Sequence, residues 1–171
     1  DETGFIWTDG TPNDYQNWAR GEPNDWQAES GPNCEAGDSS PDTGLGEDCV
    51  EQYTHGGYEW NDLSCDHERA YICSRGCEAY VPPPPPPPPA ASDEWQGALC
   101  TYELFEDTSL GGRSFQEAEE VCVSNGGHLA SIHDATTLSH IGSLVAAAEV
   151  QEGVWIGLHD RHVESRCDET G

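Results

Sequence analysis

The chain contains no lysine, and its six basic residues, all arginine, stand against 33 aspartate and glutamate residues. The formal net charge of −27 argues against nucleic acid and anionic membranes as partners, because like charges repel. Cations are the expected partners. An apolar run of about 18 residues, which a membrane-spanning helix requires, is also missing. No signal peptide is visible, so we expect a mature or excised segment.

The eight cysteines form no Cys-x-x-Cys pair, and their spacing to histidine matches no zinc-finger pattern. An even number of cysteines without such motifs favours disulfides and an oxidising compartment. The Asn-x-Ser/Thr sequon is absent as well, so N-glycans are not expected. These features predict a secreted protein of the extracellular matrix or the cell surface.

Oxygen-bearing side chains gather in three short stretches, at residues 21–25 (Gly-Glu-Pro-Asn-Asp), 46–49 (Gly-Glu-Asp-Cys) and 60–62 (Trp-Asn-Asp). Ca²⁺ takes about six to eight oxygen ligands and tolerates irregular geometry. Pro23 lies between two oxygen donors, and a cis bond before it would point both flanking side chains toward one ion. The pattern predicts a calcium site whose open positions face a ligand.

Local patterns predict two helices among several strands. Ser114 and Glu117 form a capping box before one apolar stripe, and Asp134 can cap a second helix. Apolar and aromatic runs bounded by turn residues predict strands near residues 5–7, 49–54, 58–60, 70–73, 99–105 and 155–158.

Eight consecutive prolines divide the chain. Such a run adopts polyproline II at about 3.1 Å per residue, which predicts a stiff spacer of roughly 25 Å. An SH3-type ligand is the alternative, although that role is cytosolic. Similar runs in secreted wall and matrix proteins are often hydroxylated and then O-glycosylated, and the candidate positions here are Pro82, Pro83, Pro84, Pro85, Pro86, Pro87, Pro88 and Pro89.

Short motifs lie on both sides of this run. Before it stand residues 22–24 (Glu-Pro-Asn), 47–49 (Glu-Asp-Cys), 60–62 (Trp-Asn-Asp) and 71–73 (Tyr-Ile-Cys). After it stand residues 114–118 (Ser-Phe-Gln-Glu-Ala), 127–132 (Gly-His-Leu-Ala-Ser-Ile) and 155–158 (Trp-Ile-Gly-Leu). Together they resemble the C-type lectin-like domain. The resemblance implies an α+β fold with two helices, small antiparallel sheets, a long calcium-binding loop and disulfides.

The two halves of the resemblance stand in reverse order. The tetrapeptide Asp-Glu-Thr-Gly occurs at residues 1–4 and again at 168–171, which gives a period of 168 − 1 = 167 residues. We therefore expect a window cut from a tandem repeat, in which residues 1–80 end one domain, 81–94 are the linker and 95–171 begin the next domain. A circular permutant and separate chains that complement each other head to tail are the alternatives. All three contain the same domain, and the tandem and head-to-tail arrangements also predict a filament of neighbouring copies.

The resemblance implies a sugar-binding calcium ion held by Glu22, Asn24, Glu47, Asn61 and Asp62. In the family, sugar hydroxyls bind that ion and also hydrogen-bond to its ligands, so the first four residues form the expected carbohydrate site. The Glu-Pro-Asn order resembles the mannose type, in contrast to the Gln-Pro-Asp order of galactose types. A domain that keeps the fold without the metal is the alternative.

A second calcium ion is suggested by Asp25, Asp48, Asp160 and Glu164, of which Asp160 and Glu164 are four apart and match the family's spacing. An acidic loop in solvent is the alternative. We therefore expect one or two calcium ions per domain.

The resemblance also implies the disulfides Cys49–Cys65 and Cys73–Cys122. Residues 25–46 are longer than the family usually allows, and we pair Cys34 with Cys167 as a staple for this insertion. Cys77 and Cys100 flank the proline run, and they can join terminal strands of one domain or clasp consecutive domains.

These interpretations predict a calcium-dependent carbohydrate-binding module in an extracellular repeat protein that assembles into a fibre, and no enzyme. Paired carboxylates would also suit a glycosidase, but cation binding accounts for the same acids. The alternative is a structural bead-and-rod protein in which calcium only stabilises the domain and no sugar binds.

Overall fold

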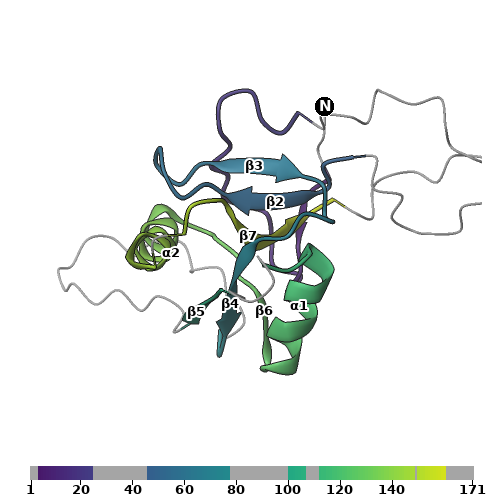
Figure 1. Cartoon of the computed structure of the whole chain (residues 1–171), viewed down its shortest axis with the longest axis vertical. Helices are drawn as coiled ribbons and strands as arrows, with labels where there is room; N and C mark the ends of the chain where they lie inside the picture. Colours follow the sequence, from purple (N-terminus) through teal and green to yellow (C-terminus); the bar gives the residue numbers. More distant parts are fainter. Residues whose placement is uncertain (1–3, 25–45, 78–99, 107–111, 149, 161–171) are drawn as a thin grey trace, which may run out of the picture.

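The computed structural model describes residues 4–24, 46–77, 100–106, 112–148 and 150–160 (Figure 1). The helices and most strands lie where the sequence predicts them. In chain order they are β1 (Ile6–Trp7), β2 (Cys49–Gln52), β3 (Trp60–Leu63), β4 (Ala70–Arg75), β5 (Thr101–Phe105), α1 (Phe115–Ser124), β6 (Gly127–Leu129), α2 (Ala135–Ala147) and β7 (Val154–His159).

The strands form one sheet in the order β3-β2-β7-β4-β5, with β1 on β7 and β6 on β4. Strand β7 is buried along its whole length and pairs antiparallel with β2 and parallel with β4. The resemblance suggested small antiparallel sheets, whereas this parallel pairing joins the strands into a single mixed sheet. In Figure 1 the two helices lie on either side of β4.

Both sides of the proline run contribute to this sheet. Strands β1 to β4 precede the run, and β5 to β7 and both helices follow it. The two parts interleave, because β2 lies beside β7 and β4 lies beside β5. This is the domain that the tandem, permuted and head-to-tail arrangements have in common. No described helix is long and apolar enough to cross a membrane.

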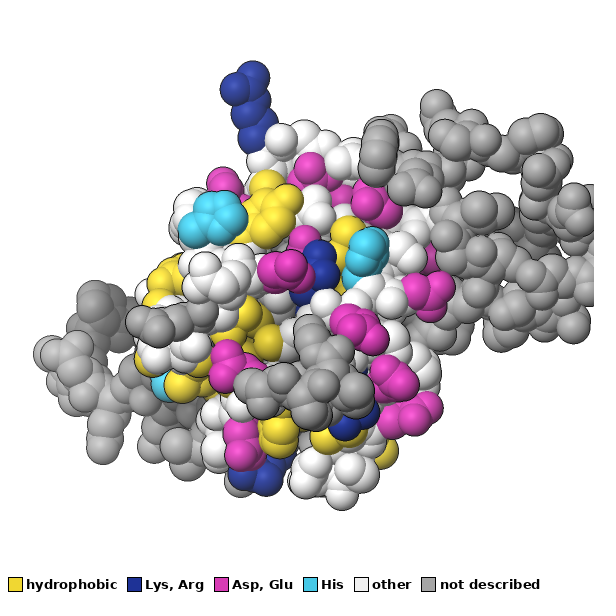
Figure 2. All heavy atoms as spheres, in the orientation of Figure 1, with side chains coloured by type: hydrophobic (Ala, Val, Ile, Leu, Met, Phe, Trp, Pro, Cys, Tyr) yellow, Lys and Arg dark blue, Asp and Glu magenta, His cyan; other side chains and the backbone are white. Residues whose placement is uncertain are grey.

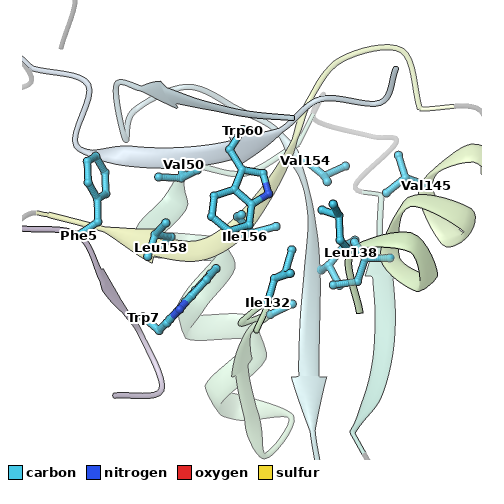
Figure 3. Packing of buried hydrophobic residues seen from close by; sticks show 13 residues of the cluster. Phe5, Trp7, Val50, Trp60, Ile132, Leu138, Val145, Val154, Ile156 and Leu158 are labelled. Atoms are coloured by element: carbon cyan, nitrogen blue, oxygen red, sulfur yellow. The ribbon is translucent and has the colours of Figure 1, made fainter. Parts of the chain in front are cut away.

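The main core lies where these parts meet (Figure 3). Trp7 and Trp60 come from the first part and pack edge to face with ring centroids 5.8 Å apart. Ile156 and Leu158 of β7 belong to the same cluster and are fully buried. Full burial of such side chains stabilises the fold by about 1.5–3 kcal/mol each.

A second cluster packs α1 against β4 and β7. Phe115 of α1 contacts Trp155 of β7 edge to face at 5.7 Å, and Tyr71 of β4 is buried beside them. The disulfide Cys73–Cys122 ties β4 to α1 within this cluster.

The disulfides Cys49–Cys65 and Cys73–Cys122 are the pairs that the resemblance implies. Cys77 bonds to Cys100, just beyond the register pair formed by Arg75 and Thr101. This bond joins the end of β4 to the start of β5, two paired strands of the same sheet. Cys34 and Cys167 lie outside the described residues.

Side-chain caps start both helices. The capping box at α1 is formed as predicted, since Ser114 Oγ accepts from the Glu117 amide and Glu117 Oε2 accepts from the Ser114 amide. At α2, Asp134 Oδ1 accepts from the Thr136 and Thr137 amides at 2.8 and 2.7 Å. These bonds satisfy amides that have no partner within the helix.

The turn between β2 and β3 rests on α2. Tyr58 has a positive φ of 60°, which is uncommon for a residue other than glycine. Its carbonyl accepts from Asn17 Nδ2 at 3.0 Å, and its ring lies against Gly142 of α2. A Cβ at Gly142 would lie 2.3 Å from the Tyr58 ring, so only glycine leaves room for this contact.

The Gly142→Ala substitution should destabilise the protein by about 1–3 kcal/mol through overpacking, despite a helix-propensity gain of about 1 kcal/mol. In a Tyr58→Asn background the ring is gone, and the same substitution should become stabilising. Urea unfolding of the four proteins measures this coupling. A Gly142→Ala variant as stable as the parent would contradict the proposed packing.

The Asp134→Ala substitution should cost about 1 kcal/mol, because two amides at the start of α2 lose their acceptor. Asp134→Asn keeps a capping oxygen and should retain most of that stability. Equilibrium denaturation compares the two variants, and an equal loss in both would argue against capping.

Candidate functional site

The segment at residues 17–24 is held against β3 before it reaches the expected ligands. Ala19 donates its amide to the Trp60 carbonyl at 2.8 Å, and the Trp60 amide donates to the Asn17 carbonyl at 2.8 Å. Trp18 packs on Phe5 and on Trp60, with ring centroids 5.0 and 5.9 Å apart. The contacts of the partly buried Trp18 with the buried rings of Phe5 and Trp60 therefore set where this segment approaches β3.

Three of the expected calcium ligands meet at this edge of the sheet. The Asn24 amide donates to Asp62 Oδ2 at 2.8 Å, and Asn24 Nδ2 donates to the Glu22 carboxylate. The Glu22–Pro23 peptide bond is cis. Glu22 and Asn24, from the loop, thus lie beside Asp62 of β3.

The carboxylates at this edge repel one another. Asp62 is fully buried, and Glu22 is partly buried beside it. Burial raises the pKa of Glu22 above its ordinary value, and the Asp62 side chain raises it further through a hydrogen bond and through its charge. A divalent cation between two such groups would offset the repulsion, so the donor set fits Ca²⁺.

Tyr53, at the end of β2, lies in the same negative field. Burial raises its pKa, and the charges of Glu51, Glu22, Asp62 and Glu47 raise it further. The carboxylate of Glu47 therefore acts on the same small region as those of Glu22 and Asp62.

Asn61 has a partner that the sequence analysis missed. Its Nδ2 donates to Glu51 Oε1 at 3.2 Å, and Glu51 Oε2 accepts from Arg69 Nε at 2.7 Å. Glu51 is only 5% exposed, and Arg69 also contacts the exposed Glu152 at 3.1 Å. The available signal was Arg69 itself, one of six basic residues, placed directly before the β4 strand.

Of the second expected calcium site, the described residues contain Asp48 and Asp160. The Asp160 amide donates to the Asp48 carbonyl at 3.0 Å, and Asp160 is 4% exposed. Asp25 and Glu164 lie outside the described residues. Within the described ranges, no three His, Cys, Asp or Glu side chains are already arranged to hold a metal. Elsewhere, acidic side chains are spread over the face seen in Figure 2.

Comparison with known proteins identifies part of the chain directly. The family model for the lectin C-type domain matches residues 111–168. The human C-type mannose receptor 2 is 28% identical over 165 residues, which covers 92% of this chain and 9% of the receptor. The rat versican core protein is 34% identical over 80 residues, or 46% of this chain and 2% of that protein.

The chain therefore corresponds to a small part of each relative's length. No solved structure matched it. The family match and the fold agree, because the matched residues supply α1, α2 and β7 around which the other strands assemble. The chain contains a C-type lectin domain, built in its described residues from two helices, a mixed sheet and three disulfides.

Proposed function

We propose that the domain is a calcium-dependent carbohydrate-binding module. Glu22, Asn24, Glu47, Asn61 and Asp62 would supply oxygens to the ion, and sugar hydroxyls would complete its coordination. The module binds and releases its ligand and carries out no reaction. The names of the relatives, a mannose receptor and a core protein, suit such a role outside the cell.

The observation that carries this proposal is the hydrogen bond from the Asn24 amide to Asp62 Oδ2. It brings a loop and a strand that are 38 residues apart to one edge of the sheet. The oxygens of Glu22, Asn24 and Asp62 therefore converge in a region that the charges of Glu47 and Glu51 make still more negative. A hard cation that prefers oxygen ligands is the natural occupant.

We also propose that the domain repeats, with the proline run as a spacer and neighbouring copies forming a filament. The receptor match covers 92% of the chain, so it includes residues on both sides of the proline run in their printed order. A window across two consecutive domains predicts one such continuous match.

A structural role is the second candidate. The acidic surface and the proline run also suit a bead on a rod, in which calcium stiffens the domain without binding sugar. Chelation distinguishes the roles. Loss of sugar retention with intact fibres supports the lectin, and softer fibres from a protein without sugar affinity support the bead.

Calcium should bind with a Kd of about 0.1–1 mM, as in extracellular calcium modules. At about a hundredfold Kd it should raise the free energy of unfolding by about 2.7 kcal/mol, compared with EDTA. Glu22→Gln and Asp62→Asn each replace a charged ligand and should weaken binding at least about tenfold, or about 1.4 kcal/mol. Isothermal titration calorimetry and thermal melts measure both effects.

Glu103→Gln is the matched control. Glu103 lies on β5, its side chain is 45% exposed, and it pairs with Arg75 at 2.7 Å. Its substitution therefore removes one negative charge at a position distant from the candidate site. This variant should bind calcium like the parent. An equal loss in all three variants would mean that net charge, and not these ligands, governs binding.

Immobilised mannose should retain the parent protein in calcium and release it in EDTA. The double substitution Glu22→Gln/Asn24→Asp converts the Glu-Pro-Asn order to Gln-Pro-Asp and should shift retention toward galactose, as the resemblance implies. Column elution volumes on both sugars report the change. A parent that binds calcium but neither sugar would favour the structural bead.

A further inference from the structure

Glu51 is a buried carboxylate with no place in the proposed ligand set. It lies in β2 directly opposite Asn61 of β3 in the antiparallel register, so the two side chains share one face of the sheet. Its exposure is 5%, and Gly153 closes over it so tightly that a Cβ there would lie 2.1 Å from Glu51 Oε2. A carboxylate in such a place requires polar partners on both oxygens.

Those partners are Arg69 and Asn61. Arg69 Nε donates to Glu51 Oε2 at 2.7 Å, and Asn61 Nδ2 donates to Glu51 Oε1 at 3.2 Å. A guanidinium only donates, and an ionised carboxylate only accepts. Of the three side chains, only the Asn61 amide has both a donor and an acceptor and can present either one to a neighbour. An ionised Glu51 carboxylate can accept a hydrogen bond only from the amide nitrogen.

We propose that Glu51, held by Arg69, is a positioning residue that orients the Asn61 amide so that its oxygen, and not its nitrogen, faces the calcium ion. This inference rests on the proposed function. It assigns Glu51 no direct contact with the ion, since both of its oxygens already accept hydrogen bonds, from Arg69 and from Asn61. The two ends of an amide have nearly the same shape, so only hydrogen bonding selects which one the ion meets.

The location of Glu51 supports this role. Its carboxylate lies 3.2 Å from Nδ2 of Asn61, which is one of the expected calcium ligands. Asn61 is followed directly by Asp62, whose carboxylate contacts the loop through the Asn24 amide. The chain of contacts therefore runs from Arg69 through Glu51 to Asn61, the residue before Asp62 in β3.

Glu51→Gln tests the inference, because Arg69 accepts no hydrogen bond. The new amide must turn its oxygen to Arg69 and its nitrogen to Asn61, which then turns its own oxygen away from the ion. The Kd for Ca²⁺ should rise about 10–100-fold, the usual effect of losing a group that orients a metal ligand. Isothermal titration with CaCl₂ on the full chain measures the Kd, and thermal melts in EDTA check the fold.

Two further variants separate orientation from charge. Glu152→Gln removes one charge from the same arginine, but Glu152 is 71% exposed, so the Kd should stay within about twofold. In Glu51→Gln/Asn61→Asp the net charge is that of the parent. The carboxylate introduced on β3 accepts from the amide introduced on β2, and it offers only oxygens to the ion. Calcium binding should return to within about threefold of the parent.

The outcomes are distinct. If the parent binds calcium and Glu51→Gln binds it equally well, the inference falls and the proposed function stands. Equal weakening in Glu51→Gln and Glu152→Gln overturns it too, because charge alone would then explain the loss. A parent that binds no calcium overturns the proposed function and this inference together. If Glu51→Gln does not fold, the double variant must fold and bind calcium, and its failure to bind overturns the inference.

Discussion

The pairing of β7 with β2 on one edge and β4 on the other is the constraint on which the rest of this domain depends. Strand β7 is buried throughout, so every residue needs packing on both faces and backbone partners on both edges. Those partners come from the part of the chain before the proline run. The two parts cannot bury their apolar faces separately, which is why motifs in reversed order still build one C-type lectin domain.

The candidate site is a consequence of that packing. Strand β3 pairs with β2, and Trp60 of β3 sits in the core against Trp7. The segment at residues 17–19 bonds to Trp60 and carries the chain to Glu22 and Asn24, beside Asp62. Hydrophobic burial thus supplies the free energy that holds mutually repelling carboxylates together, and a calcium ion would offset the remaining repulsion.

The acidic composition has two separate consequences in the fold. Among the described residues, exposed acidic side chains are spread over the face seen in Figure 2, where water solvates them. Glu51, Asp62 and Asp160 are buried, and Glu22 and Glu47 beside Asp62 are partly buried. Burial of a charge is costly unless a partner offsets it, and Arg69 pairs with Glu51 while the Asn24 amide donates to Asp62.

Much of this arrangement could be read from the sequence, because it depends on local patterns. The capping box at Ser114, the apolar stripes of both helices and the Glu-Pro-Asn and Trp-Asn-Asp motifs are short-range signals. Only the tertiary structure decided that β4 runs parallel to β7, that Cys77 bonds to Cys100 within one domain, and that Glu51 and Arg69 lie behind Asn61. These features depend on contacts between residues far apart in the chain, and a single sequence does not record which distant side chains share a buried space.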